Sequence, residues 1–271
     1  MINSKVDPAT TASIVESGPH RDDGAETPMI IVGGTGGSGT RAVAHYLSMA
    51  GVFMGSRLNR SMDSLPFAVV LDQYTDQWLA FRDDEARGFD REGFVSLWRD
   101  RAREHLAGHN PLELWGTKNP RTILILELLY QSFAQMRFLH VIRDGLEMAY
   151  SSNQRQLTIH GEGILGPAMP GETPPERSLR LWAVVNDQAR QLGKRQPGRY
   201  ACVRYEDFCV NPVGEMQRIA RQLSLHLQHQ NIRRSDYLRS TRRIAPDDAA
   251  TILPLNPSVA GTRSRFGYPA L

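Results

Sequence analysis

The feature that most constrains the fold is a run of glycines directly after a short apolar segment. Met29–Val32 is apolar and mostly β-branched and is bounded by a proline and by glycines, which is typical of a buried parallel strand. The loop Gly33–Arg41 follows at once, and apolar residues then recur at helical spacing up to Gly51. Successive backbone N–H groups of small residues at a strand-to-helix junction can converge on an anion. The segment therefore predicts a strand, an anion-binding loop and a helix.

The rest of the chain alternates in the same way. Strands are expected at Phe138–Ile142 and Tyr200–Tyr205, with helices between them. We predict an α/β fold in three layers, a parallel sheet flanked by helices, of the P-loop nucleotide-binding type. Residues 1–27 are polar and are expected to form a disordered tail, and residues 28–271 a single domain. Residues 160–175 are rich in Gly and Pro and predict a long loop, of the kind that often covers a substrate.

Composition narrows the possible ligands. Lys and Arg number 32 against 29 for Asp and Glu, an excess that suits a small anionic ligand and is too weak to indicate nucleic acid. Cys202 and Cys209 have neither a disulfide framework nor a metal-binding spacing, so we expect structural thiols and no metal site. The N-terminal segment lacks an apolar stretch long enough for a signal peptide or a membrane span. These observations favour a cytoplasmic protein.

Two common types of glycine-rich loop fit this sequence poorly. Gly34, Gly36 and Gly39 match the G-x-G-x-x-G pattern of dinucleotide-binding folds, which leaves an NAD(P)-dependent oxidoreductase as one candidate. That fold needs a second strand ending in an acidic residue about 20 positions further on, and the nearest candidate, Asp63, follows a polar run. An ATP-hydrolysing P-loop requires Gly-Lys-Ser/Thr, whereas threonine and arginine follow Gly39.

The most specific signal is a set of short motifs along the chain. The glycine loop contains Gly37-Ser38-Gly39-Thr40, and Lys118-Asn119-Pro120 ends a predicted loop, residues 116–120, before a helix. Arg143-Asp144-Gly145 closes a predicted strand, Ser151 follows eight residues after Arg143, and Arg204-Tyr205-Glu206-Asp207 follows the last strand. Together these motifs resemble the 5′-phosphosulfate loop and the Lys-x-Pro, Arg-Asp-Gly and Ser sequence of sulfotransferases of the tyrosylprotein and bacterial type. The main resemblance covers roughly residues 28–155.

The resemblance implies a sulfotransferase that uses 3′-phosphoadenosine 5′-phosphosulfate, an anionic nucleotide donor, and needs no metal. Arg143 and Ser151 would hold the donor's 3′-phosphate, and Lys118 and Arg41 would neutralise the leaving oxygen. By the same likeness Asp63 would take a proton from an unidentified hydroxyl or amine acceptor. The full donor-binding set implied is Gly36, Gly37, Ser38, Gly39, Thr40, Arg41, Arg143, Ser151 and Tyr205.

The chain departs from the family at one position of the loop. The family's basic residue falls on Gly37, so its charge must come from Arg41 or from Lys118. A chain that had lost this cation without replacement would be a non-catalytic nucleotide-binding protein. The sequence therefore leaves three functions open: a sulfotransferase, a dinucleotide-dependent oxidoreductase and a non-catalytic binding protein.

Several candidates also have purely structural explanations. Arg143 at a strand end could pair with its neighbour Asp144, and Asp63 could be an ordinary surface aspartate. A regular helix would carry Ser151 about 9 Å along its axis from Gly145, so sharing one phosphate with Arg143 requires a turn or an irregular helix start. His140 lies inside an apolar strand and is expected to be a hydrogen-bonded core histidine.

Overall fold

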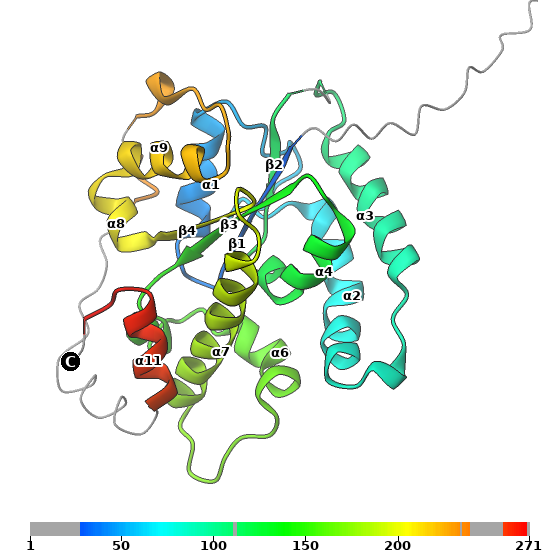
Figure 1. The fold of residues 1–271 in the computed structure, drawn as a ribbon, viewed down its shortest axis with the longest axis vertical. Coiled ribbons are helices and arrows are strands. Elements are labelled where there is room, and N and C mark those ends of the chain that lie inside the picture. The colour runs from blue at the N-terminus through cyan, green and yellow to red at the C-terminus, as the bar shows by residue number, and fades with distance from the viewer. Residues whose placement is uncertain (1–27, 111–112, 234, 239–256, 270–271) are drawn as a thin grey trace, which may run out of the picture.

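A single parallel sheet organises the chain. The structure, a computed structural model, describes residues 28–110, 113–233, 235–238 and 257–269, so the tail predicted at 1–27 lies outside the described residues. The strands pair in the order β2-β1-β3-β4 and are all parallel, which confirms the predicted fold class (Figure 1). Their bounds are β1 (Met29–Gly33), β2 (Trp115–Lys118), β3 (Met136–Ile142) and β4 (Tyr200–Arg204).

The register brings the ends of the strands that carry candidate residues to one edge. Val32 of β1 lies beside Lys118 of β2, and Ile142 of β3 lies beside Arg204 of β4. Ligands of open α/β sheets bind outside this carboxyl edge. The prediction of a loop at 116–120 was wrong for its first part, because β2 continues to Lys118. Gly116 permits this pairing, since a Cβ there would stand 2.8 Å from the Ile30 carbonyl oxygen.

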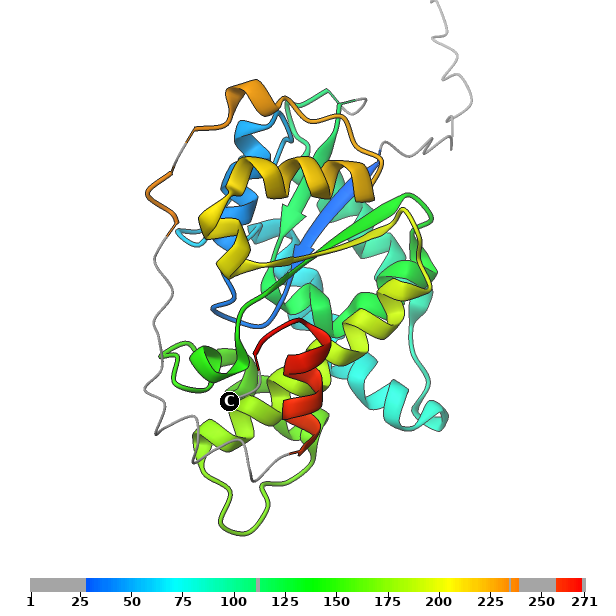
Figure 2. The same ribbon diagram turned by 60° about the vertical axis from the view of Figure 1, so that its left-hand side comes forward.

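Helices cover both faces of the sheet (Figures 1 and 2). One face carries α1 (Thr40–Met49), α8 (Tyr205–Val210) and α9 (Pro212–Gln222). The helical segments on the other side and around the carboxyl edge are α2 (Leu65–Asp83), α3 (Arg91–His105), η2 (Pro120–Ile125), α4 (Leu126–Ser132), α5 (Gly145–Ala149), α6 (Arg155–Leu165), α7 (Pro174–Lys194) and α11 (Pro257–Arg265). Short 3₁₀ turns lie at η1 (Glu85–Arg87) and η3 (His229–Asn231). Among the described residues no helix is both long enough and apolar enough to cross a lipid bilayer.

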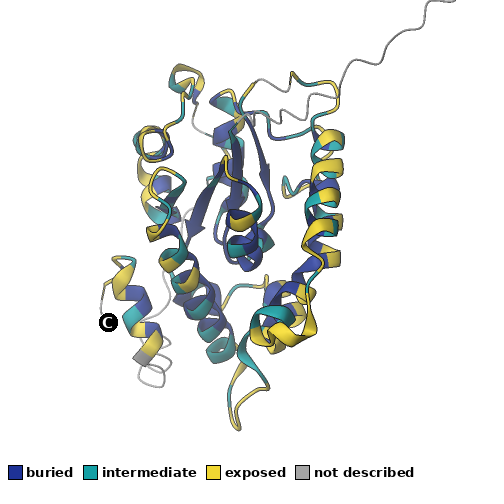
Figure 3. Cartoon of the chain, turned by 45° about the vertical axis from the view of Figure 1, so that its right-hand side comes forward, coloured by how far each residue is buried: buried dark blue, intermediate teal, exposed yellow. Residues whose placement is uncertain are grey.

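Burial on both faces explains the unbroken apolar run of β1. All five of its residues are buried, and the strands form the dark interior of Figure 3. Ile30 and Val32 pack with side chains of α1 and α9, whereas Met29 and Ile31 pack with those of α2, α4 and α7. A strand buried on both faces needs no alternation of polar and apolar residues.

The long loop predicted at 160–175 is shorter in the structure. Helix α6 continues to Leu165, and Gly166, with φ of 72°, then takes a conformation that ends it. Helix α7 begins at Pro174, where Thr173 and Glu176 form a reciprocal capping box. Residues 166–173 remain as the connection. The glycines of α6 therefore led to the prediction of a loop, whereas tertiary packing keeps this segment helical.

His140 is a hydrogen-bonded core residue, as predicted. Its side chain is fully buried, with Nδ1 2.8 Å from the Tyr200 hydroxyl and Nε2 2.7 Å from Asn186 Oδ1. Burial lowers the pKa of His140 to about 4. A neutral imidazole with both nitrogens engaged ties β3 to β4 and α7 and is not placed to act as a base.

Candidate active site

The glycine loop leads directly into the N-terminus of α1. The first N–H groups of a helix have no intrahelical acceptor, and α1 has no acidic residue in its first turn to compete for them. The hydroxyls of Thr35 and Ser38 are buried and have no hydrogen-bond partner among the described residues. Buried hydroxyls are normally paired. Two such groups beside a helix N-terminus therefore mark a place where an oxygen-rich anion would complete the hydrogen bonding.

Two glycines of the loop are required by geometry. Gly39, with φ of 96°, caps α1, and a Cβ there would stand 2.1 Å from Cδ2 of Tyr205. The Tyr205 ring consequently lies flush against the loop. Gly37 has φ of 94°, a region that disfavours any residue with a side chain. The basic residue that the resemblance would place at this position would therefore be strained.

Gln156 of α6 fixes the loop from the opposite side, and the sequence analysis did not identify it. Its Oε1 accepts from the Gly36 N–H at 2.9 Å, and its Nε2 donates to the Gly34 carbonyl at 3.3 Å. The contact joins residues 120 positions apart, and no local pattern marks a glutamine for this purpose. The Gly36 amide is therefore engaged within the protein, and the Ser38 amide donates to the Thr35 carbonyl at 3.1 Å. Among the described residues of the loop, this leaves the amides of residues 37 and 39–41 for an anion.

Lys118 and Asp63, predicted separately as catalytic residues, are in direct contact. Lys118 Nζ lies 2.7 Å from Asp63 Oδ1 and 2.8 Å from the Ser61 carbonyl oxygen. Only 3% of the lysine side chain is exposed against 20% of the aspartate, so Lys118 is a buried cation. Burial lowers the pKa of Lys118, and Arg41 adds to the decrease, while Asp63 opposes it.

A turn and a buried histidine hold this ion pair in place. Asn59 Oδ1 accepts from the Asp63 N–H, and Asn59 Nδ2 donates to Asp63 Oδ2, both at 2.9 Å. The next residue, Ser64, donates its N–H to the Lys118 carbonyl and contacts His105 Nδ1 through its hydroxyl at 2.9 Å. His105 Nε2 lies 2.9 Å from the Gly116 carbonyl, which can only accept, so the proton is on Nε2. Burial lowers the pKa of His105, which favours this neutral form.

Arg41 lies beside the same pair. Its guanidinium carbon is 5.0 Å from the centre of the Tyr237 ring. Its charge contributes to the lowered pKa of Lys118, after the larger effect of burial. Two cations therefore stand at the loop, one on α1 and one at the end of β2. Within the described part of the chain no group of His, Cys, Asp and Glu side chains could hold a metal ion.

Arg143 has a different partner from the one its sequence suggested. Its guanidinium pairs with Glu147, four residues further on, with Nε at 2.7 Å from Oε2, and lies 5.5 Å from the centre of the Tyr205 ring. Asp144 instead receives two hydrogen bonds from Arg263 of α11, at 3.0 and 2.9 Å. The pKa of Glu147 is raised, chiefly by burial. The Arg143 charge opposes this increase, and the charges of Glu206 and Asp144 add to it. The carboxylates of Glu147, Glu206 and Asp144 therefore lie around the guanidiniums of Arg143 and Arg263.

Ser151 lies in a turn just beyond the end of a short helix, and not on an extended helix. Helix α5 ends at Ala149, and the Ser151 N–H donates to the Met148 carbonyl in the turn that follows. The Ser151 hydroxyl lies 3.3 Å from the point where a Cβ on Gly37 would stand. The structure therefore gathers Ser151, Tyr205 and the glycine loop, with Arg143 packed on Tyr205.

Comparisons with known proteins agree with this geometry. A profile described as the sulfotransferase family matches residues 28–229. A protein-tyrosine sulfotransferase of Drosophila melanogaster is 24% identical over 209 residues, which cover 74% of this chain and 38% of that protein. The chain therefore spans about two fifths of that relative's length.

Solved structures share the fold at low sequence identity. The sulfotransferase domain of the Synechococcus olefin synthase has a TM-score of 0.51 at 14% identity and covers 90% of this chain and 95% of that domain. A sulfotransferase from Mycobacterium avium has a TM-score of 0.54 at 14% identity, with 90% and 78% covered. Similarity at this identity shows the fold alone. Since the family profile matches most of the sequence, this chain belongs to the sulfotransferase family.

Proposed function

We propose that this chain transfers a sulfuryl group from 3′-phosphoadenosine 5′-phosphosulfate to a hydroxyl or amine group of an acceptor. The observation that carries the proposal is the meeting of two features at the carboxyl edge. The buried hydroxyls of Thr35 and Ser38, which have no hydrogen-bond partner in the described part of the chain, stand at the start of α1. The buried pair Lys118–Asp63 stands at the end of the neighbouring strand. The first feature suits an anionic donor, and the second supplies a cation and a base for transfer.

The donor would lie along the loop with its two phosphate groups at opposite ends. The backbone N–H groups of residues 37 and 39–41 and the Ser38 and Thr40 hydroxyls would hold the 5′-phosphate and sulfuryl oxygens, with Gly36 beside them. Arg143 and Ser151 would hold the 3′-phosphate, and the ring of Tyr205 would pack on the nucleoside. Arg143 would then share its guanidinium between Glu147 and the ligand. Packing of Tyr205 on Gly39 and of Ser151 by Gly37 supports this assignment.

The reaction is a single in-line displacement at sulfur. The Asp63 carboxylate would take the proton of the acceptor group as the acceptor's oxygen or nitrogen bonds to sulfur. The bond between sulfur and the bridging phosphate oxygen breaks, and its electron pair stays on adenosine 3′,5′-bisphosphate. Lys118 and Arg41 would stabilise that charge in place of the cation missing at Gly37. The 2.7 Å contact between Lys118 and Asp63 holds the proposed cation and the proposed base next to each other at the carboxyl edge.

A cleft beside the ion pair is the proposed acceptor site. It has a volume of about 230 Å³ and is bounded by both Gly36 and Asp63. Most of its lining side chains are polar, and the apolar ones are Ala68, Pro120 and Ile159. A cleft of this kind suits a polar acceptor group and is too small for an extended apolar molecule.

Calorimetric titration with adenosine 3′,5′-bisphosphate tests donor recognition. We expect binding to the wild type and a loss of at least tenfold in Arg143→Ala, because a charge-assisted contact with phosphate is removed. Asp187→Ala, a substitution at an exposed ion pair on α7, is the control and should leave binding unchanged. No detectable binding to the wild type would remove the basis of the proposal.

Two further assays separate the alternative functions. Titration with NADH or NADPH tests the dinucleotide hypothesis, which the structure disfavours because β2 ends in Lys118 and not in an acidic residue. Transfer of labelled sulfate from the donor to any pool of acceptors excludes a non-catalytic binding protein. Binding of the bisphosphate without any such transfer would favour that third function.

A further inference from the structure

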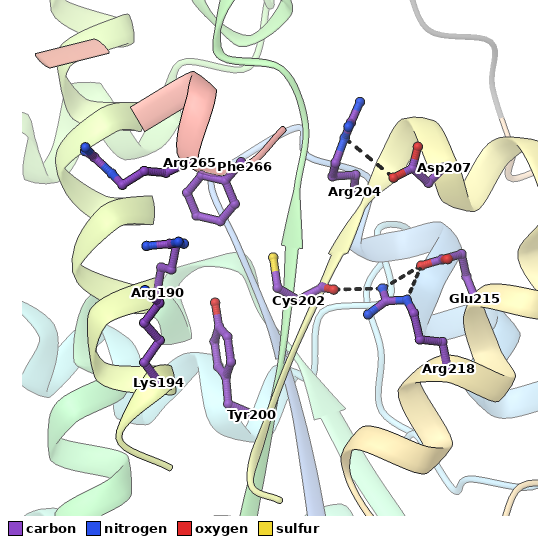
Figure 4. Close-up of a pocket in the computed structure, with 10 residues that line it drawn as sticks. All are labelled: Arg190, Lys194, Tyr200, Cys202, Arg204, Asp207, Glu215, Arg218, Arg265 and Phe266. Atoms are coloured by element: carbon purple, nitrogen blue, oxygen red, sulfur yellow. Dashed lines mark hydrogen bonds and ion pairs between the residues drawn. The ribbon is translucent and has the colours of Figure 1, made fainter. Parts of the chain in front are cut away.

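A second pocket lies along the outer side of β4, the edge strand of the sheet (Figure 4). We call it the β4-edge pocket. Its volume is about 390 Å³, larger than the proposed acceptor cleft. Helix α7 forms one wall and α9 the other, with β4 as the floor and the end of α11 above (Figure 4). Five basic side chains line it: Arg190, Lys194, Arg204, Arg218 and Arg265.

The pocket carries an excess of positive charge that its own carboxylates do not neutralise. Only Asp207 and Glu215 line it with the five cations, an excess of three that equals the formal net charge of the whole chain. Arg218 pairs with Glu215, and Arg204 lies 3.6 Å from Asp207 (Figure 4). Arg265 pairs with Asp187 outside the pocket.

Two of the five cations remain available to a ligand. In the part of the chain that the structure describes, neither Arg190 nor Lys194 has a carboxylate partner within 4.0 Å. Both project from α7 on the same wall of the pocket (Figure 4). A pair of unneutralised cations in one concave site favours an anionic group.

The remaining surface of the pocket is aromatic and uncharged. The Arg190 guanidinium carbon lies 5.9 Å from the centre of the Phe266 ring, and Tyr200 lies below it (Figure 4). Cys202 forms part of the floor, and burial raises the pKa of its thiol to about 12. The thiol is therefore neutral at physiological pH, which suits a binding surface and not a nucleophile.

The β4-edge pocket is separate from the site described above. Its residues include none of the proposed donor-binding or catalytic residues and none that line the acceptor cleft. It begins beside Arg204, at the carboxyl end of β4, and continues back to Tyr200 at the start of that strand. The glycine loop follows β1 and Lys118 ends β2, and β3 separates both of these strands from β4. Binding of a ligand in this pocket would therefore not depend on the proposed sulfuryl transfer.

We propose that the β4-edge pocket is a second ligand site, which binds a small organic anion with a flat apolar body. The phosphate, sulfate or carboxylate group of the ligand pairs with Arg190 and Lys194. Its flat body packs against Phe266 and Tyr200, where rings and guanidiniums offer stacking surfaces. The volume fits a ligand of about the size of an aryl phosphate.

Calorimetric titration with phenyl phosphate at low ionic strength tests the proposal. Excess adenosine 3′,5′-bisphosphate is present in one series and omitted in the other, so that any binding at the glycine loop is identified. The double variant Arg190→Gln/Lys194→Gln removes the two unneutralised charges and breaks no ion pair of the described structure, and glutamine suits a helix. Arg195→Gln is the matched control, because it removes an exposed charge next to Lys194 outside the pocket.

We expect phenyl phosphate to bind the wild type and Arg195→Gln equally, with or without the bisphosphate, and the double variant at least tenfold more weakly. Inorganic phosphate should bind several-fold more weakly than phenyl phosphate because it lacks the ring. Equal thermal unfolding of the double variant and the wild type shows that the loss is local. The proposal is overturned if the wild type does not bind, if the double variant binds as well, if the bisphosphate displaces the probe, or if inorganic phosphate binds as tightly.

Discussion

Replacing Asp63 by alanine would leave the ammonium of Lys118 buried without its carboxylate partner. The opposite change, Lys118→Met, would remove the buried charge and leave a carboxylate whose side chain is 20% exposed and still bound to Asn59. Both variants should lose sulfuryl transfer, by about 10² to 10⁴-fold where a proton-transfer group is removed. Their stabilities should differ, because the two partners are buried to different extents.

Breaking a buried ion pair by removing one partner costs about 3–5 kcal/mol. For Asp63→Ala we expect the lower end, about 3 kcal/mol, because the Ser61 carbonyl still accepts from Lys118. At about 2–4 °C per kcal/mol, the melting temperature should fall by roughly 6–12 °C. Lys118→Met should cost about 1 kcal/mol or less, since a methionine fills the site without a charge to desolvate. Asp72→Ala is the control, because its pair with Arg121 has a carboxylate that is 66% exposed and contributes little.

Urea unfolding at several pH values tests the argument. Burial lowers the pKa of Lys118 in the folded chain below the usual 10.5, so between those two values the unfolded chain binds a proton that the folded chain lacks. The free energy of unfolding therefore rises with pH in that window. Loss of Asp63 lowers the folded pKa further and widens the window, so its destabilisation should shrink from pH 7 towards pH 10. Equal losses in the two variants, or a loss in Asp63→Ala that does not change with pH, would refute the reasoning.

Three further predictions concern the loop and the core. Gly37→Arg restores the family's basic residue but should destabilise the fold by about 1–2 kcal/mol, because φ is 94° there, and urea unfolding would measure this. Gln156→Leu removes two hydrogen bonds from the loop and should weaken bisphosphate binding about tenfold in calorimetry, with an unchanged circular dichroism spectrum. The free energy of unfolding should fall by up to about 3 kcal/mol as the pH drops from 6.5 to 4, because the unfolded chain takes up a proton that buried His140 does not. Urea midpoints of the wild type should therefore depend more steeply on pH in this range than those of His140→Gln.

Local sequence patterns were sufficient for the part of the fold that surrounds the loop. An apolar run buried on both faces, glycines with positive φ and a helix of clear periodicity all lie within about 20 adjacent residues. Lys118 and Asp63 were each predicted to take part in the chemistry. Their direct contact depends on the pairing of β1 with β2 and on the turn at Asn59, neither of which the sequence specifies.

Contacts between distant segments could not be predicted in the same way. Gln156 reaches Gly36 across 120 positions, and His105 joins Ser64 to Gly116 from a third element. These are common polar residues on helices, where no spacing rule singles them out. The partner of Arg143 could not be predicted for a different reason. Its neighbour Asp144 forms an ion pair with Arg263, which lies 119 residues further along the chain.

The ion pair between Arg263 and Asp144 limits how far the protein can be shortened for expression. The family match stops at residue 229, whereas Arg263 lies in α11 and is almost fully buried against Asp144. A recombinant protein cut at the end of the match would keep the three carboxylates around Arg143 and lose one of the two guanidiniums that neutralise them. The 3′-phosphate site proposed there would then repel its ligand. We therefore expect a protein that folds and binds the donor to need residues beyond the matched segment, Arg263 among them.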